Sequence, residues 1–234
     1  MDIRQLHPWN LEPRDAIATQ KRLACQIVLE GAPQDVRTVA GADISIAGGK
    51  GRGAVVVLPY PELRLLEHQV VESELTFPYV PGLLAFREVP VLAEAFQRLE
   101  QTPDLLLVDG QGLAHPRRFG IACHLGLLLD LPTIGCAKSR LVGEHGPVGE
   151  EVGSRVELRD GPEVIGLVLR TRTGVTPVYV SAGHRIGLAE AAEWVVRLCR
   201  GYRLPEPARL AHQAAGGQMI AAVTEPAAEQ MTLF

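Results

Sequence analysis

The chain has 234 residues, of which 47% are hydrophobic, so it is long enough to bury a large core. Its 27 acidic residues outnumber its 23 lysines and arginines, and the net charge of −4 excludes tight binding to nucleic acid through global basic charge. No apolar run approaches the roughly 20 residues of a membrane span, and the polar N-terminus does not resemble a signal peptide. Four scattered cysteines without a CxxC pattern are typical of reduced thiols. We therefore expect a cytoplasmic protein without a membrane partner.

The first third of the chain predicts one helix followed by three strands. Residues 13–30 carry spaced apolar side chains between a proline and a glycine, a pattern typical of an amphipathic helix. The glycine-rich residues 48–53 predict a hairpin turn rather than a phosphate loop, because no helix follows them. Asp43 lies inside the first strand, where aspartate is rare. The three strands form an antiparallel meander and are predicted over residues 39–46, 54–58 and 65–75.

The middle of the chain predicts a stiff connector, a helix and a parallel βαβ unit. Two prolines restrict the backbone of residues 76–82, and the helix predicted over 83–100 carries Glu88 and an internal Pro90. The apolar run of residues 105–108 is typical of a strand buried on both faces, and it is followed at once by Asp109 and a Gly-x-Gly turn. A strand at 103–108, a helix at 118–129 and a strand at 133–137 form a right-handed crossover.

The remaining elements complete an α/β fold. Surface loops and a hairpin are predicted over 143–163, strands over 164–169 and 178–181, and helices over 188–199 and 203–212. The order of elements matches a ribonuclease H-like arrangement, in which a central mixed five-stranded sheet carries helices on both faces. In that arrangement the first and fourth strands are neighbours. We expect a single domain over residues 1–212 and a flexible tail over residues 213–234, which are rich in Ala, Gly and Glu.

Neighbouring first and fourth strands bring Asp43 and Asp109 together near the centre of the sheet. Two close carboxylates repel each other unless a cation lies between them, and such oxygen ligands suit Mg²⁺, with Mn²⁺ as a substitute. Glu88 is expected to reach this site from the preceding helix. His212 is expected to complete it from the last helix, as a ligand or as an acid or base. Phosphodiester hydrolysis requires this kind of metal assembly.

Each of these residues has a plainer explanation when it is taken alone. Asp109 can cap a turn, Glu88 can be a solvated helix charge, and His212 can be a packing histidine. The nearby basic residues can likewise be ordinary surface charges: His115, Arg117, Arg118, Lys138 and Arg140. Together, however, they describe an acidic metal centre surrounded by groups that bind phosphate, which is the charge pattern of an enzyme that cleaves a nucleic-acid strand.

Five blocks of the sequence resemble the endonuclease V family of deoxyinosine-specific repair nucleases. They are VAGAD at 39–43, FPYVPGLLAFRE at 77–88, VDGQGLAHPR at 108–117, AKSRL at 137–141 and VSAGHR at 180–185. The resemblance runs in order from about residue 10 to residue 212. It implies a metal-dependent endonuclease that recognises deoxyinosine in DNA. The enzyme would cut the second phosphodiester bond 3′ to the lesion and leave a 3′-hydroxyl and a 5′-phosphate.

The resemblance also implies roles for individual residues. Asp43, Glu88 and Asp109 would hold the metal, with His212 close by and Lys138 near the scissile phosphate. A wedge that separates the strands and stacks at the lesion would comprise Pro78, Tyr79, Val80 and Pro81, with His115 and Arg117 contacting the DNA backbone. The pocket for the flipped hypoxanthine base would be lined by Gly82, Leu84, Gly110, Gly120 and Leu141. Small residues there let backbone groups read the edge of the base.

Three other functions compete with this one. The first is an endonuclease that prefers inosine in RNA, since the sequence does not settle which sugar is read. The second is a non-catalytic module that binds lesions, against which the presence of all three carboxylates speaks. The third is a phosphotransferase of the sugar-kinase type, which would require two duplicated halves that the sequence lacks. We expect a monomer whose partner is deoxyinosine-containing DNA.

Overall fold

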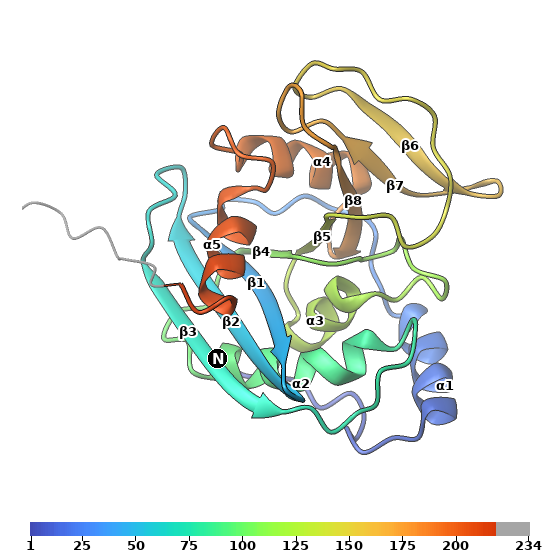
Figure 1. Cartoon of the computed structure of the whole chain (residues 1–234), viewed down its shortest axis with the longest axis vertical. Coiled ribbons are helices and arrows are strands. Elements are labelled where there is room, and N and C mark those ends of the chain that lie inside the picture. The colour runs from blue at the N-terminus through green and yellow to red at the C-terminus, as the bar shows by residue number, and fades with distance from the viewer. Residues whose placement is uncertain (219–234) are drawn as a thin grey trace, which may run out of the picture.

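The computed structural model describes residues 1–218, which form one mixed sheet of eight strands with helices packed on its faces (Figure 1). The strands lie in the order β3-β2-β1-β4-β5-β8-β7-β6. Their bounds are β1 Thr38–Ala47, β2 Lys50–Pro59, β3 Glu67–Glu74, β4 Leu105–Val108, β5 Thr133–Ala137, β6 Arg155–Asp160, β7 Glu163–Leu169 and β8 Val178–His184. The predicted α/β class and the helices on both faces are confirmed.

The predicted number of five strands in the sheet is wrong, because three more strands extend it beyond β5. β8 pairs antiparallel with β5, β7 pairs with β8, and β6 forms the new edge. The sequence predicts strands at 164–169 and 178–181, but their place in the central sheet depends on pairing between distant residues. β8 forms hydrogen bonds with the edge of β5, whose backbone groups would otherwise remain unpaired.

The predicted meander is correct, but the turn is shorter than residues 48–53. Only Gly48 and Gly49 have the positive φ angles of a turn, and β2 already begins at Lys50. Gly51 and Gly53 therefore lie inside a strand that pairs with β1 on one side and β3 on the other. Two ladders of backbone hydrogen bonds compensate for the weak strand preference of glycine.

β1 and β4 are parallel neighbours, as the sequence predicts. Ala42 lies opposite Val108, and the N–H of Asp109 donates to the Ala42 carbonyl at 3.0 Å. β4 continues through α3 into β5, which lies parallel to it and completes the predicted βαβ unit. The residue that follows each of these paired positions is an aspartate, so the register alone brings Asp43 and Asp109 together.

The described residues form five helices: α1 Pro13–Ala24, α2 Leu84–Gln97, α3 Ile121–Leu129, α4 Leu188–Arg197 and α5 Glu206–Ala215. The last four pack on the sheet, whereas α1 packs outside α2 and α3. The predicted helix over 13–30 is six residues too long, because Val28 leaves the helix to bond with the β8 region. Its N–H donates to His184 Nδ1 and its carbonyl accepts from the N–H of Arg185. α2 accommodates Pro90 without ending there.

The sheet separates two cores, which explains the alternating pattern of the central strands. Val39, Leu105 and Leu107 belong to the core on the side of α4 and α5, whereas Ala40 and Leu106 belong to the core on the side of α2 and α3. β4 is buried on both faces, as its continuous apolar run predicts.

α5 is the last described helix, and it packs against β1 and β2 (Figure 1). It extends through residues 213–215, which the sequence assigned to the tail, and Ala214 and Ala215 are buried in the core. Residues 216–218 follow the helix, and the remaining tail residues, 219–234, lie outside the described residues. No helix in the described part of the chain is both long enough and apolar enough to cross a membrane.

Candidate active site

Three side chains from three distant parts of the chain converge at the centre of the sheet. Asp43 comes from β1, Asp109 directly follows β4, and His212 lies on α5. One ligand atom from each lies within 4.8 Å of the others. The two carboxylates are the hard oxygen ligands that Mg²⁺ or Mn²⁺ binds in proteins, and the imidazole lies beside them. The predicted meeting of the two aspartates, with His212 beside them, is what the structure contains.

A lysine lies among these groups. The Lys138 ammonium forms an ion pair with Asp109 Oδ2 and lies 3.2 Å from His212 Nδ1, which in turn lies 2.6 Å from Asp43 Oδ2. The carboxylates are almost completely buried, whereas Lys138 and His212 are partly open to solvent. A positive charge thus already lies between the acids, and the donor set fits a cation at this place.

Glu88 belongs to the same electrostatic field but lies outside the tight cluster. It is buried on α2, and its pKa is raised to about 8, first by burial and then by the charges of Asp43 and Asp109. Burial, and next the charge of Asp109, also raises the pKa of Asp43. A cation bound among these carboxyl groups would offset the burial and the neighbouring negative charge that raise the pKa values of Asp43 and Glu88.

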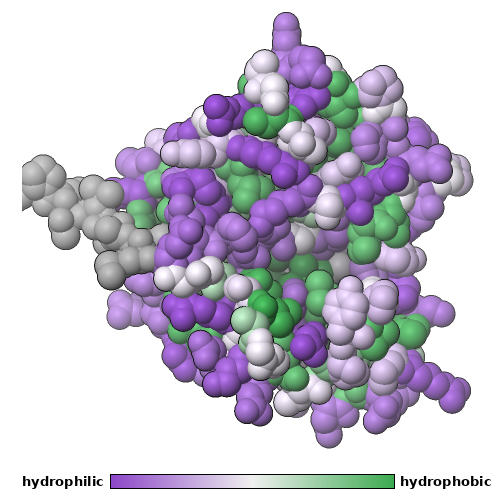
Figure 2. All heavy atoms as spheres, in the orientation of Figure 1, coloured by the Kyte–Doolittle hydropathy of each residue, from purple (hydrophilic) through white to green (hydrophobic). Residues whose placement is uncertain are grey.

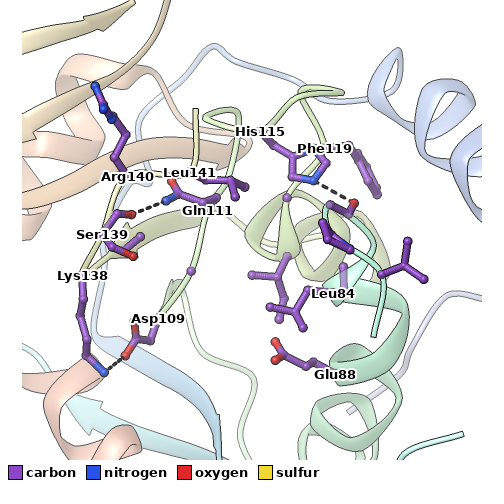
Figure 3. Close-up of a pocket in the computed structure, with 18 of the residues that line it drawn as sticks. Leu84, Glu88, Asp109, Gln111, His115, Phe119, Lys138, Ser139, Arg140 and Leu141 are labelled. Atoms are coloured by element: carbon purple, nitrogen blue, oxygen red, sulfur yellow. Dashed lines mark hydrogen bonds and ion pairs between the residues drawn. The ribbon is translucent and has the colours of Figure 1, made fainter. Parts of the chain in front are cut away.

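A pocket of about 390 Å³ opens beside the acidic cluster (Figure 3). Glu88 and Leu84 on α2 face Asp109 and Lys138 across it. All five residues predicted to line a base pocket do line it: Gly82, Leu84, Gly110, Gly120 and Leu141. On the space-filling surface the middle of this face is hollowed, with hydrophobic side chains in and below the hollow (Figure 2).

The floor of the pocket is closely packed backbone. A Cβ atom on Gly120 would lie only 2.2 Å from the Gln111 carbonyl oxygen, so the chain before α3 can pass under the Gly-x-Gly turn only without a side chain. The N–H of Gly120 donates to the carbonyl of Gly112 at 3.0 Å and joins the two loops. The glycines therefore form a rigid surface beneath a ligand.

The predicted wedge forms one rim of the pocket. Tyr79, Val80 and Pro81 line it, and Tyr79 is 72% exposed, whereas Pro78 lies outside the lining. His115 also lines the pocket, but Arg117 does not. Both of these residues direct hydrogen-bond donors at the carbonyl of Gly82 rather than into open solvent.

Two pocket residues carry no role in the sequence predictions, Gln111 and Ser139, and Gln111 Nε2 donates to the Ser139 carbonyl at 2.9 Å. Arg140, one of the basic residues expected around the metal centre, also lines the pocket. Gln111 lies between the two glycines, so its position in the motif was a usable signal. Gln20 is fully buried behind the pocket rim. Its signal was a polar residue on the apolar face of α1, in line with the buried Ala16 and Leu23.

Residues 21–213 match a protein-family model described as Endonuclease V. The chain belongs to the endonuclease V family. An Endonuclease V of Dehalococcoides mccartyi (strain BAV1) is 54% identical over 215 residues, which cover 91% of this chain and 96% of the relative. One of Gloeobacter violaceus is 55% identical over 212 residues and covers 88% and 86%. The resemblance inferred from the five sequence blocks is confirmed, and so is the prediction that the chain is a nuclease.

Solved endonuclease V structures share the whole fold. The Bacillus subtilis Endonuclease V superposes with a TM-score of 0.88 at 31% identity, covering 93% of this chain and 96% of that one. The Ciona intestinalis Endonuclease V, solved with a DNA 24-mer containing an inosine followed by a ribo-adenosine, gives a TM-score of 0.77 at 28% identity. It covers 87% of this chain and 95% of that one.

Proposed function

We propose that this endonuclease V family member is a DNA repair enzyme that recognises deoxyinosine. It would hydrolyse the second phosphodiester bond 3′ to the lesion and leave a 3′-hydroxyl and a 5′-phosphate. The observation that carries the proposal is that the acidic cluster and the pocket meet at consecutive residues, Asp109 and Gly110. A flipped base in the pocket would therefore hold the adjoining backbone next to the carboxylates. The inosine-containing DNA in the Ciona relative's structure supports this substrate.

We assign the ribonuclease H-like fold to the five strands β3-β2-β1-β4-β5. β2 runs antiparallel to β1, and β4 and β5 run parallel to it, which is the mixed order expected for that fold. The three added strands would then be an extension that supports the loop after β5, from which Lys138 and Leu141 reach the site.

The proposed cofactor is Mg²⁺, with Mn²⁺ as a substitute, held by Asp43, Asp109 and Glu88, with His212 as a further ligand or as an acid or base. Bound there, the cation would activate water and stabilise the charge that develops on the phosphate. The side chains have their own tasks. The Lys138 ammonium would pair with an oxygen of the scissile phosphate, and His212, half exposed beside Asp43, would exchange protons with solvent.

Recognition of the base would rest on the backbone of the pocket. Hypoxanthine presents O6 and N1–H where adenine presents an amino group and an unprotonated N1. Backbone groups around Gly82, Gly110 and Gly120 can therefore pair with one base and leave a buried polar group unpaired with the other. The exposed Tyr79 side chain in the wedge Pro78–Pro81 would stack where the base has left the helix.

The deciding experiment is cleavage of matched oligonucleotide duplexes by the wild-type protein. A duplex with one deoxyinosine should be nicked in Mg²⁺ at the second bond 3′ to the lesion, whereas the adenine duplex and reactions in EDTA should remain intact. Faster cleavage of an inosine-containing RNA would favour the RNA-directed alternative. Binding of deoxyinosine DNA without any cleavage would favour the lesion-binding module.

A further inference from the structure

The wedge loop, residues 78–82, is attached to the body of the protein at both of its ends. At the first end the Arg87 guanidinium of α2 donates to the Phe77 carbonyl at 2.5 Å. At the second end the carbonyl of Gly82 accepts from three different side chains. Between these ends the Tyr79 side chain is largely exposed. The loop is thus fixed where it joins the fold and free where it would meet DNA.

The three donors to Gly82 come from two separate parts of the chain. Gln20 Nε2 of α1 donates at 3.0 Å, His115 Nε2 at 3.0 Å and an Arg117 Nη at 2.5 Å. His115 Nδ1 accepts the N–H of Arg117, so its proton is on Nε2, where it can donate to Gly82. Three donors on one carbonyl, one of them charged, are more than a surface loop needs.

Gln20 connects this carbonyl to a second segment that lines the pocket, the chain just before α3. Its Nε2 also donates to the Phe119 carbonyl at 3.2 Å, and its Oε1 accepts from Arg117 Nε at 2.5 Å. Phe119 and Gly82 both line the pocket. One fully buried amide therefore joins the end of the wedge loop to the chain before α3 and orients the guanidinium that contacts Gly82.

The backbone at this point suits only an anchored glycine. Gly82 has a φ of +78°, and a Cβ there would lie 2.6 Å from the Arg117 guanidinium. The guanidinium thus occupies the position that a Cβ would take, so a side chain at residue 82 would have to displace it. Movement away from it would break the hydrogen bonds to Gly82.

We propose that Gln20, His115 and Arg117 are positioning residues that hold the wedge loop against the pocket and so set the width of the base site. This assignment replaces the DNA-backbone contacts that the sequence suggested for His115 and Arg117. Its consequence for base selection rests on the proposed function, whereas its consequence for the loop itself does not. A pocket of fixed width allows backbone groups to discriminate between bases, because a loose wall lets the wrong base move to other partners.

The first test needs no substrate. Gln20→Leu removes the bridging amide at similar volume, and Arg117→Lys keeps the charge but loses the fork of donors. Both variants should raise the amide hydrogen exchange of Leu83 and Gly120, whose N–H groups bond to Val80 and Gly112 across this region, by about tenfold. Arg185→Lys, which alters an arginine paired with Asp130, is the matched control. Unchanged exchange in both variants would overturn the proposal.

The second test separates positioning from contact with phosphate. Affinity for a deoxyinosine duplex is measured in EDTA at several salt concentrations. Loss of a phosphate contact reduces the slope of log K against log salt by about 0.9, whereas loss of a positioning residue lowers affinity at an unchanged slope. Arg117→Gln should keep the wild-type slope. A reduced slope would assign Arg117 to the DNA backbone and refute its role as a positioning residue.

The third measurement links the loop to specificity. Gln20→Leu and Arg117→Lys should reduce the ratio of affinities for deoxyinosine and adenine duplexes by about tenfold, with circular dichroism and thermal melting establishing that each variant is folded. Equal losses for both duplexes would mean that the residues only support the fold. If the wild type itself does not distinguish the duplexes, the proposed function fails, and the exchange experiment still decides whether the loop is anchored.

Discussion

Asp109 illustrates how one side chain can depend on several neighbours for its charge. The residue follows a strand buried on both faces, its carboxylate is nearly covered, and Lys138 provides the positive charge that it needs. Asp43 lies 2.6 Å from His212 Nδ1. In each pair the aspartate is buried and its partner reaches solvent, so the exposed side chain can move when a cation or a phosphate arrives.

Replacing Asp109 by Asn should abolish metal-dependent cleavage and preserve binding. The amide keeps the shape of the side chain but removes one of the two central carboxylates, so we expect a loss of roughly 10³-fold in the cleavage rate of a deoxyinosine duplex. Affinity for the same duplex in EDTA should fall little, because the pocket loop is unchanged. Asp104→Asn is a matched control outside the site. The Asp104 carboxylate lies just before β4 and accepts hydrogen bonds from the N–H groups of Arg37 and Thr38, where β1 begins. Full activity in Asp109→Asn would refute the metal-site assignment.

A buried pair of histidines should make stability depend on pH. His7 Nδ1 lies 2.8 Å from the Pro8 carbonyl and must donate to it, so the 2.7 Å contact between the two Nε2 atoms requires a proton on His124. Both rings are then neutral, and burial lowers the pKa of each, most strongly that of His124. Because the folded pKa lies below the unfolded value of 6.5, the folded state binds fewer protons, and stability is lost as the pH falls below about 6.5.

His124→Gln tests this pair, because glutamine retains a donor for His7 but does not titrate. Between pH 7 and pH 5 the wild type should lose about 1–2 kcal/mol more of its unfolding free energy than the variant. Urea unfolding at several pH values measures the difference. His68→Gln, at an exposed position on β3, should retain the wild-type pH profile. Parallel profiles for wild type and His124→Gln would contradict the interpretation.

At the scale of elements, the contact between β1 and α5 decides whether His212 reaches the site. Gly41 lies under the first turn of α5, and a Cβ on it would approach the Pro207 carbonyl oxygen to 2.0 Å. Asp43 follows two residues later on the same face of β1, and His212 lies five residues after Pro207 on α5. The absence of a side chain at residue 41 therefore allows the helix to lie close enough for the imidazole to contact Asp43.

Gly41→Ala should displace α5 and weaken the site together with the fold. Overpacking against backbone cannot be relieved by a rotamer change, so we expect a destabilisation of about 2–3 kcal/mol in urea unfolding and a slower cleavage reaction. Gly146→Ala is the control, because a Cβ there meets nothing within 4 Å. A Gly41→Ala protein as stable and active as the control would show that α5 is not seated as closely as the structure indicates.

At the scale of the whole molecule, the acidic cluster connects segments that are far apart in the chain. Its members lie at residues 43, 109 and 212, and Glu88 adds a further carboxyl group from α2. Packing against the sheet forces these acids together, whereas the unfolded chain separates them. Ligand binding to such a site occurs only in the folded state and must stabilise the fold as a whole.

Magnesium should therefore raise the melting temperature of the wild-type protein relative to EDTA. A concentration 100-fold above the dissociation constant corresponds to about 2.7 kcal/mol of added stability. Asp109→Asn should lose most of this increase. Lys138→Ala should show a larger increase than the wild type, because the competing ammonium is removed while both carboxylates remain. An equal increase in Asp109→Asn and wild type would mean that the ion binds elsewhere.

Local sequence patterns predict much of this structure. Each of these patterns depends only on neighbouring residues: the apolar run of β4, the alternation along β1, and the proline and glycine at the helix ends. The sequence was therefore sufficient to predict them. The same applies to Asp43 and Asp109, because a carboxylate in or directly after a buried strand has few ordinary explanations. Glycine spacing and the family motifs indicated the pocket for the same local reason.

Other features arise only when distant segments meet. The extension of the sheet to eight strands depends on β8 pairing with β5, which no local pattern specifies. Glu88 lies outside the tight cluster, because the position of α2 determines how far its side chain reaches. His115 and Arg117 have the charge of DNA ligands in the sequence, but their donors meet at the Gly82 carbonyl because Gln20 and the loop after β4 fold against the same point. The residue type alone gives the charge of a side chain, whereas the group to which that side chain donates depends on three-dimensional contacts.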